Sequence, residues 1–138
     1  MNMTGKEFDL EIVTSKRVVF NSRVESFSAP GVLGGFQVLH SHAPLLSNLT
    51  IGVVKVLDAE GKETHYATSG GFVEIRNNKA VMLAETAERS DEIDVARAQA
   101  SVARAQDRIS TKHAGVDVDR ARQSLLRALN RLKVSGSQ

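Results

Sequence analysis

The residues whose spacing most clearly suggests a binding site are arginines in the last third of the chain. They recur at intervals of three and four residues in two separate segments, and each segment also carries a serine. Because residues three and four apart lie on one face of an α-helix, each segment forms a single polar stripe. The first stripe comprises Asp94, Arg97, Ser101, Arg104 and Arg108, and the second comprises Arg120, Ser124, Arg127 and Arg131. If the apolar faces of the two helices pack together, the two stripes can border one groove.

The preference for arginine indicates what such a groove would bind. Two solvated flanks of an amphipathic helix pair would show the same spacing, and spacing alone favours that interpretation. Arginine, however, binds carboxylates and phosphates in a planar, bidentate way that lysine does not. Nucleic acid is one such anion, but no aromatic residue on which a base could stack follows Glu85. The pattern therefore favours a small polyphosphate, and we expect no nucleic-acid partner.

Two histidines in the first half of the chain imitate the start of a metal site. Gly34 is followed by His40 and His42 with the spacing that opens a cupin metal motif. The carboxylate expected a few residues further on is replaced by Leu46 and Ser47, so a third ligand is missing. We therefore favour a pair of loop histidines and expect no metal, and a cupin-like metal enzyme remains the disfavoured alternative.

Sequence motifs for catalysis on nucleotides or esters are absent. The chain contains neither G-x-x-x-x-G-K-[ST] nor G-x-G-x-x-G, and Ser69-Gly70-Gly71 lacks the surroundings of a G-x-S-x-G hydrolase turn. No pair of acids is marked by its context as a general acid and base. We assign no catalytic residue and no catalytic cofactor, and we expect a protein that is not an enzyme.

Composition is that of a globular chain. It has 138 residues, no cysteine and no tryptophan, and 41% hydrophobic and 25% charged residues. No apolar run approaches the ~20 residues of a membrane span, so we expect no direct membrane insertion. The N-terminal sequence MNMTGKEFDLEIV lacks the features of a signal or transit peptide, and we interpret it as mature cytosolic sequence.

The composition changes after Glu85. All six aromatic residues, both prolines and eight of the ten glycines lie before that point, and Ala, Arg and Leu dominate after it. The first part has 8 basic and 9 acidic residues and the second has 10 and 7, so the net charge of +2 divides into −1 and +3. We predict two domains, residues 1-86 and residues 87-138.

Short stretches of alternating apolar residues in the first part predict an antiparallel β-sandwich. Asp58–Lys62 (DAEGK) and Arg76–Lys79 (RNNK) have the composition of hairpin turns, with Gly or Asn where a positive φ is needed. Six large apolar residues cluster around a predicted loop, and we expect about two thirds of them to lie in the core and the rest to form a contact surface. They are Val32, Leu33, Phe36, Leu39, Leu45 and Leu46.

From Ser90 onward the apolar residues follow a helical period. Asp91 is expected to cap a first helix, the segment Thr111–Val116 (TKHAGV) to interrupt it, and Asp117 to cap a second helix. Together these features predict an α+β protein in which a β-sandwich precedes an α-helical hairpin. The apolar face of the first helix is expected to contain Ile93, Val95, Ala96, Ala98, Ala100, Val102, Ala103, Ala105 and Ile109, and that of the second Val118, Ala121, Leu125, Ala128, Leu129 and Leu132.

Several stretches of the sequence resemble, in the right order, the landmarks of one protein family. They are PGVLGGFQVL at 30–39 with HAPLL at 42–46, SGGFVEI at 69–75, and AER at 87–89 followed by Ile93-Asp94. The chain thus resembles the epsilon subunits of rotary F-type ATP synthases over nearly its whole length. His40-Ser41 stands where the family commonly has Pro-Gly, a departure that alters only the turn of a loop.

The resemblance implies a non-catalytic rotor subunit in the central stalk of a proton-translocating ATP synthase. The sandwich would bind the gamma subunit and the c-ring. The hairpin would fold against the sandwich, or extend along gamma to the alpha and beta subunits and inhibit ATP hydrolysis. The implied location is the cytoplasmic face of the bacterial plasma membrane, as a peripheral protein. A free-standing ATP-binding adaptor is the alternative.

Some bacterial members of this family bind ATP as a regulatory ligand, with or without magnesium, through a motif I/L-D-x-x-R-A that residues 93–98 match. By this analogy the ATP would hold the hairpin in its compact form, because a ligand favours the state that binds it better. Arg104 and Arg108 remain unassigned. The analogy places Glu88, Ile93, Asp94 and Ala98 beside the adenine, and Arg97, Arg127 and Arg131, together with Arg120, on the phosphates.

Overall fold

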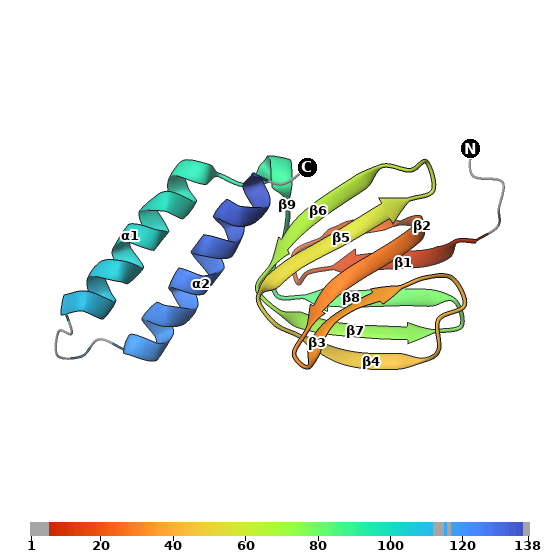
Figure 1. Cartoon of the computed structure of the whole chain (residues 1–138), viewed down its shortest axis with the longest axis horizontal. Helices are drawn as coiled ribbons and strands as arrows, with labels where there is room; N and C mark the ends of the chain where they lie inside the picture. The colour runs from red at the N-terminus through yellow and green to blue at the C-terminus, as the bar shows by residue number, and fades with distance from the viewer. Residues whose placement is uncertain (1–5, 112–114, 116, 137–138) are drawn as a thin grey trace.

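The computed structural model describes residues 6–111, 115 and 117–136, and these form two parts (Figure 1). The described strands make one continuous nine-stranded sheet that folds over on itself as a β-sandwich. Two helices, α1 (Val95–Thr111) and α2 (Val118–Ser135), lie side by side at one end of the sandwich as a hairpin. The predicted α+β class and the order of sandwich and hairpin are confirmed.

The strands follow one another closely along the chain. They are β1 (Phe8–Val13), β2 (Val18–Gly31), β3 (Gly34–Val38), β4 (Leu45–Leu49), β5 (Gly52–Asp58), β6 (Glu63–Thr68), β7 (Gly71–Arg76), β8 (Lys79–Ala84) and β9 (Ala87–Arg89). Their order in the sheet is β1-β8-β7-β4-β2-β5-β6-β9, with β3 beside β2 and β1 also paired to β2. The strand pairs of the described chain are antiparallel apart from β1 and β8, which are parallel.

The alternation of apolar and polar residues determines which face of each strand is buried. In β1, Phe8, Leu10 and Ile12 are buried, whereas Asp9 between them is exposed. A strand presents successive side chains to opposite faces, so each such segment has one apolar face to bury. The buried faces meet in a single core, to which the long strand β2 contributes Val24 and Phe27.

Both predicted hairpin turns are confirmed. Between β5 and β6, Oδ1 of Asp58 accepts hydrogen bonds from the backbone N–H groups of Glu60 and Lys62, both at 2.9 Å. Between β7 and β8, Asn77 and Asn78 have φ values of 53° and 59°. Two consecutive residues of positive φ are what a tight two-residue hairpin requires, and Asn tolerates that conformation.

The expectation that about two thirds of the six loop-region apolar residues are buried is wrong. Phe36 and Leu45 are half-buried and pack against the core, but the other four are exposed. Leu46 is exposed because its neighbour Leu45 faces inward, and adjacent strand residues alternate. The exposed four are Val32 (57%), Leu33 (102%), Leu39 (52%) and Leu46 (63%).

Each helix begins at an aspartate. Oδ1 of Asp117 accepts a hydrogen bond of 3.0 Å from the backbone N–H of Arg120, which confirms the predicted cap of α2. The predicted cap of α1 is wrong, because Asp94 holds that place: its Oδ1 accepts from the N–H of Arg97 at 3.0 Å. Asp91 lies instead in a 3-10 turn, η1 (Ser90–Glu92), where its carboxylate pairs with Arg89. Residues 112–114 and 116 of the predicted interruption lie outside the described residues.

The two helices meet along a narrow seam of alanines. Ala98 and Ala105 on α1 and Ala121 and Ala128 on α2 are buried, and the members of each pair are seven residues apart. Small side chains at the contact let two helices approach closely. The expected wide apolar face of α1 is wrong: Val95, Ala96, Ala100 and Ala103 are exposed, because a single partner helix covers only a narrow face. On α2, Leu129 is also exposed.

The hairpin is anchored to the sheet through β9 and the end of α2. Strand β9, at residues 87–89, pairs with β6, and η1 then leads into α1. Ile93 and Val134 pack on Ala67 of β6 in a small apolar cluster separate from the main core. Among the described residues, neither helix combines the length and the hydropathy needed to cross a membrane.

Candidate functional site

A cavity of about 330 Å³ lies where α1, α2 and the β6–β9 side of the sheet meet. Its size is within the range of about 300–1,000 Å³ that is typical of small-molecule sites. Its polar lining comes from three places: Ser101, Arg104 and Arg108 on α1; Ser124, Arg127, Asn130 and Arg131 on α2; and Thr68, Ser69, Thr86 and Glu88 at the sheet. Part of each polar stripe predicted from the sequence therefore borders one space, whereas Asp94, Arg97 and Arg120 lie outside it.

The cavity is strongly basic. Four arginines and one glutamate are its charged lining residues, so its net charge is +3. Within the described part of the chain, no carboxylate lies within ion-pair distance of Arg104, Arg108 or Arg127. Uncompensated guanidinium groups around a partly enclosed space attract an anion, and their fork of N–H donors matches phosphate oxygens.

Two of these arginines are held in place by serines of their own helices. Nη2 of Arg104 donates to Oγ of Ser101 at 3.0 Å, and Nη2 of Arg127 donates to Oγ of Ser124 at 3.2 Å. Each serine lies three residues before its arginine, one turn back on the same face. The serines thus orient two guanidinium groups in the same way on opposite helices.

Arg131 is the one cavity arginine that is joined to the sheet. Its Nε lies 2.7 Å from Oε1 of Glu88, and its Nη2 donates to Oε2 of the same carboxylate at 3.0 Å. The pair links α2 to β9, and the two side chains are 23% and 35% exposed. Partial exposure weakens the pair through solvent screening, so the contact can exchange for another anion.

The sheet side of the cavity presents hydroxyl groups. Oγ of Ser69 lies 2.8 Å from Oγ1 of Thr86, and the backbone N–H of Ser69 donates to the same Oγ1 at 3.2 Å. Asn130 of α2 reaches across to this side, where its Nδ2 donates to the carbonyl oxygens of Gly52 and Thr68. The cavity therefore has a cationic wall of helices and a neutral polar wall of sheet residues.

The predicted site residues divide into two groups. Glu88, Arg127 and Arg131 line the cavity. The other five do not: Asp94 caps α1, Ile93 is buried against Ala67 and Val134, Ala98 is buried in the helix seam, and Arg97 and Arg120 are exposed near the starts of α1 and α2. The roles expected for all eight residues stay predictions.

Sequence reasoning left out several residues that line the cavity. Arg104 and Arg108 belong to the predicted stripe of α1, so the spacing already indicated them even though no role was assigned. Ser69, Thr86 and Asn130 carry no comparable signal, because none of them belongs to a periodic stripe, and Ser69 and Thr86 lie next to strand ends and not on the helices.

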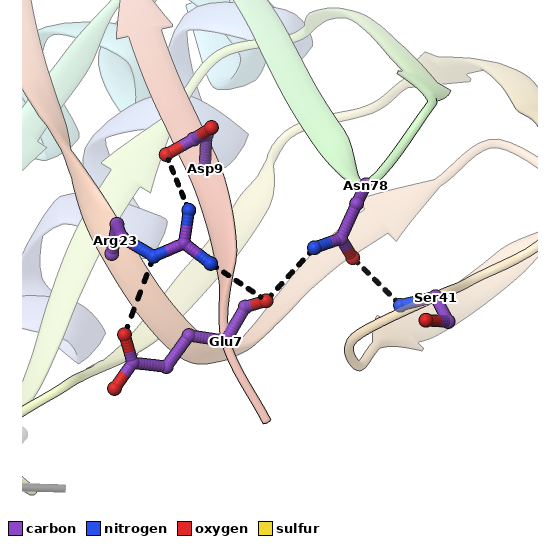
Figure 2. A network of polar contacts seen from close by, with 5 residues as sticks. All are labelled: Glu7, Asp9, Arg23, Ser41 and Asn78. Carbon is purple, nitrogen blue, oxygen red and sulfur yellow. Dashed lines mark hydrogen bonds and ion pairs between the residues drawn. The ribbon is translucent and has the colours of Figure 1, made fainter. Parts of the chain in front are cut away.

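The His40–His42 segment is organised by backbone contacts (Figure 2). The backbone N–H of Ser41 donates to Oδ1 of Asn78 at 2.7 Å, and Nδ2 of Asn78 donates to the carbonyl of Glu7 at 2.9 Å. Arg23 pairs with Glu7 and Asp9 beside this chain of bonds. No group of three or more His, Asp or Glu side chains arranged to hold a metal ion occurs in the described ranges.

Perturbed pKa values lie beside the cavity, at β6 and η1. Burial raises the pKa of Tyr66 above its usual 10.0. The hydrogen bond from Arg89 lowers the pKa of Asp91, an exposed group. Tyr66 lies in the core of the sandwich and Asp91 lies in η1, so neither belongs to the cationic wall.

Comparisons with known proteins agree along the whole chain. The family model of the ATP synthase delta/epsilon chain β-sandwich domain matches residues 7–90, and that of the long alpha-helix domain of the same chain matches residues 91–136. An ATP synthase epsilon chain of Desulforamulus reducens is 44% identical over 126 residues, which cover 91% of this chain and 95% of the relative. Another, of Pelotomaculum thermopropionicum, is 47% identical over 134 residues, covering 97% and 99%.

Two solved structures share the fold. A chain in the Euglena gracilis mitochondrial ATP synthase (OSCP/F1/c-ring) superposes with a TM-score of 0.80 at 18% identity, over 90% of this chain and 78% of that one. A chain in the central stalk and c-ring of the Tetrahymena thermophila mitochondrial ATP synthase gives a TM-score of 0.59 at 11% identity, over 92% and 95%.

Proposed function

The chain belongs to the epsilon-chain family of F-type ATP synthases, and from this premise we propose the roles of its two parts. The sandwich couples the c-ring to gamma, and the hairpin is a regulatory element that ATP holds folded. As an epsilon chain it is a non-catalytic subunit of the central stalk. What is proposed beyond that is the set of partners, the ligand and the regulation. The single observation that carries the ligand is the cavity in which four arginines face one glutamate.

The exposed apolar residues support the rotor contacts. Val32 and Leu33 form the tip of the β2–β3 turn, and Leu39 and Leu46 lie at the β3–β4 connection and on β4. Large apolar side chains exposed in groups mark interaction surfaces. We assign these surfaces to gamma and the c-ring, which would place the protein peripherally on the cytoplasmic face of the bacterial plasma membrane. Binding of Leu33→Ser to purified gamma and c-ring, each measured separately against wild type, tests the assignment.

A nucleoside triphosphate fits the positive charge of the cavity and the arrangement of its cationic and neutral walls. Arg104, Arg108 and Arg127 are available to phosphate oxygens, and Arg131 can join them by leaving Glu88. The hydroxyl wall of Ser69 and Thr86 offers neutral hydrogen-bonding groups to the rest of the ligand. The cavity alone does not indicate that five of the predicted residues contact the phosphates or the adenine, and these residues enter the proposal through the resemblance. They are Ile93, Asp94, Arg97, Ala98 and Arg120. Whether magnesium accompanies the nucleotide does not alter the roles of these side chains.

The position of the cavity connects the ligand to the conformation of the hairpin. Its lining comes from both helices and the sheet, so the complete site exists only while the hairpin is docked. A ligand that binds only one of two states shifts the equilibrium towards that state. ATP would therefore hold the hairpin compact, and falling ATP would release it.

A released hairpin is long enough to act at a distance. Helix α1 begins at residue 95 and α2 ends at residue 135, and one continuous helix between these two residues would extend about 60 Å at 1.5 Å per residue. We propose that this extended form reaches the alpha and beta subunits along gamma and inhibits ATP hydrolysis. A chain truncated after Arg89, which keeps strands β1–β9 and lacks both helices, should then make the reconstituted complex hydrolyse ATP faster than the full-length chain does, and equal rates would leave only the rotor role.

The ATP proposal is tested by ligand-dependent melting of the full chain. At an ATP concentration ten times Kd, binding adds about 1.4 kcal/mol to the free energy of unfolding. Arg127→Ala should abolish the shift in Tm, whereas Arg122→Ala should keep it, because Arg122 lies on the same helix but pairs with Asp119 outside the cavity. Equal melting with and without millimolar ATP in wild type would refute the ligand. A shift that Arg127→Ala retains would place the ligand elsewhere.

A further inference from the structure

The docked hairpin has a small apolar contact with the sheet. The cluster that joins the two parts contains three buried residues, Ala67, Ile93 and Val134, with Val53 partly buried beside them. The main core of the sandwich, in contrast, contains seventeen buried residues and none from α1 or α2. With so little apolar area at the junction, individual polar contacts decide whether the hairpin stays docked.

Asn130 makes the most direct of these polar contacts. Its Nδ2 donates to the backbone carbonyl of Gly52 at 2.8 Å, with the carbonyl of Thr68 at 3.5 Å from the same nitrogen. Gly52 and Thr68 face each other in the first register pair of β5 and β6. The amide therefore spans the end of a strand ladder and ties α2 to both strands at once.

The Asn130 contact differs in kind from the neighbouring ion pair of Arg131 and Glu88. The carboxylate of Glu88 competes with any anionic ligand for Arg131, so that pair loosens when the cavity fills. Backbone carbonyls do not compete in this way, and the Asn130 bonds lie on the neutral wall. Asn130 can therefore hold α2 in place whether or not an anion is bound.

We propose that Asn130 is a positioning residue that clasps α2 to the β5–β6 end and sets the balance between docked and released hairpin, independently of nucleotide. The inference rests on the proposed function only in treating release of the hairpin as a regulatory step. When the hairpin is docked and the amide is absent, the carbonyl of Gly52 lacks its hydrogen bond from Nδ2. When the hairpin is released, water solvates this carbonyl. Loss of the amide therefore favours release.

The test uses Asn130→Leu in the full chain without nucleotide. Leu has nearly the shape of Asn and a higher helix propensity, so it strengthens the isolated helix while it removes the donor. Helices in proteins owe most of their stability to tertiary packing, so release exposes the amides of α1 and α2 to hydrogen exchange. We expect exchange over residues 118–136 to become about fivefold faster, the factor set by one lost hydrogen bond. Gln106→Leu, at an exposed position of α1, is the matched control and should leave the rate unchanged.

Two further measurements keep the outcomes separate. Near-ultraviolet circular dichroism of Tyr66, the sole tyrosine, shows whether the sandwich of each variant is intact. Asn130→Gln, which retains an amide on a longer side chain, should recover part of the protection. Unchanged exchange in Asn130→Leu with an intact sandwich overturns the proposal, as does slower exchange. Because no nucleotide is present, these results stand whatever the ATP titration of Arg127→Ala shows.

Discussion

Substitution of Gly71 by alanine should strongly destabilise the sandwich, because an added Cβ would overlap backbone atoms of the partner strand. Gly71 begins β7 with a φ of +147°, a conformation that residues with a side chain rarely adopt. An added Cβ would overlap the carbonyl oxygen of Leu83 and lie 2.9 Å from Cα of Ala84. Both are backbone atoms of β8, the partner strand, and Gly71 is paired with Ala84 in the ladder. Relief therefore requires β7 and β8 to separate at this end.

The cost follows from two contributions. Holding a residue with a side chain in a sparsely populated backbone region costs about 1–3 kcal/mol. Opening the Gly71–Ala84 end of the ladder loses at least one backbone hydrogen bond, about 1 kcal/mol, and leaves its groups to be satisfied elsewhere. We expect the free energy of unfolding to fall by about 2–4 kcal/mol, a large share of the 5–15 kcal/mol that holds a typical domain together.

Two other glycines provide the controls. Gly61 has a φ of +85° but nothing within 4 Å of an added Cβ, so Gly61→Ala carries only the backbone cost of about 1–2 kcal/mol. Gly35 lacks a positive φ, and its Cβ would lie an ordinary 3.8 Å from the carbonyl of Ala29, so Gly35→Ala should be neutral or slightly stabilising.

The assay is urea unfolding followed by the near-ultraviolet signal of Tyr66, which is buried in the sandwich core and therefore reports on that domain. The expected order of destabilisation is Gly71→Ala, then Gly61→Ala, then Gly35→Ala. If Gly71→Ala costs no more than Gly61→Ala, the contact with β8 is soft and the reasoning from backbone overlap is refuted.

Three further predictions concern the junction and the helices. Burial raises the pKa of Tyr66, so the unfolded chain ionises first as the pH rises above about 10. The contribution of Tyr66 to the free energy of unfolding should therefore be complete below that pH and decline above it. In urea titrations a Tyr66→Phe variant should show a shallower decline. Val134→Ala removes two buried methyl groups from the hairpin contact, about 1.6 kcal/mol, and should speed hydrogen exchange in α2 roughly tenfold while the tyrosine signal stays unchanged. Asp117→Ala removes the cap of α2, about 1 kcal/mol, and should lower the helical signal in a thermal scan, whereas Asp119→Ala should not.

Local features of the fold could be predicted from the sequence because their causes are local. The turn at Asn77-Asn78 follows from two residues that tolerate positive φ, and the cap at Asp117 from a carboxylate placed just before a helical period. The predicted cap of α1, Asp91, lies three residues before the observed cap, Asp94, for a physical reason. Asp91 and Asp94 are equally capable of capping, and the η1 turn that separates them depends on how β9 leaves the sheet.

Burial was the less predictable quantity, because it depends on which other element arrives. The alternation in Leu45-Leu46 shows that one of the two faces outward, but the apolar character of both gives no clue to which one. Likewise, the alanines of α1 are equally suited to every face of the helix. Only the position of α2 selects Ala98 and Ala105 and leaves Ala96 exposed.

In the candidate site, one wall could be predicted from the sequence and the other could not. The stripe spacing brought Arg104 and Arg108 to the same face as the expected ligands, so the cationic wall could be predicted from the sequence. The neutral wall could not, since Ser69 and Thr86 reach the cavity through the pairing of β6 with β9. Three strand residues in register are enough to form that pairing, and no pattern of period two can be recognised in so short a segment.

The charge of the cavity and the small apolar area of the junction together determine whether the hairpin stays docked. Two arginines on α1 and two on α2 repel one another across the hairpin, so the empty cavity opposes the packing of the two helices, and docking on the sheet adds only the opposite charge of Glu88. Asn130, the Glu88–Arg131 pair and the small cluster around Val134 offset that repulsion. A larger apolar junction would keep the hairpin docked at any ligand concentration, and a smaller one would never dock it. A bound polyphosphate can therefore control the hairpin because the attractive contacts at the junction are few and the repulsion is one that an anion removes.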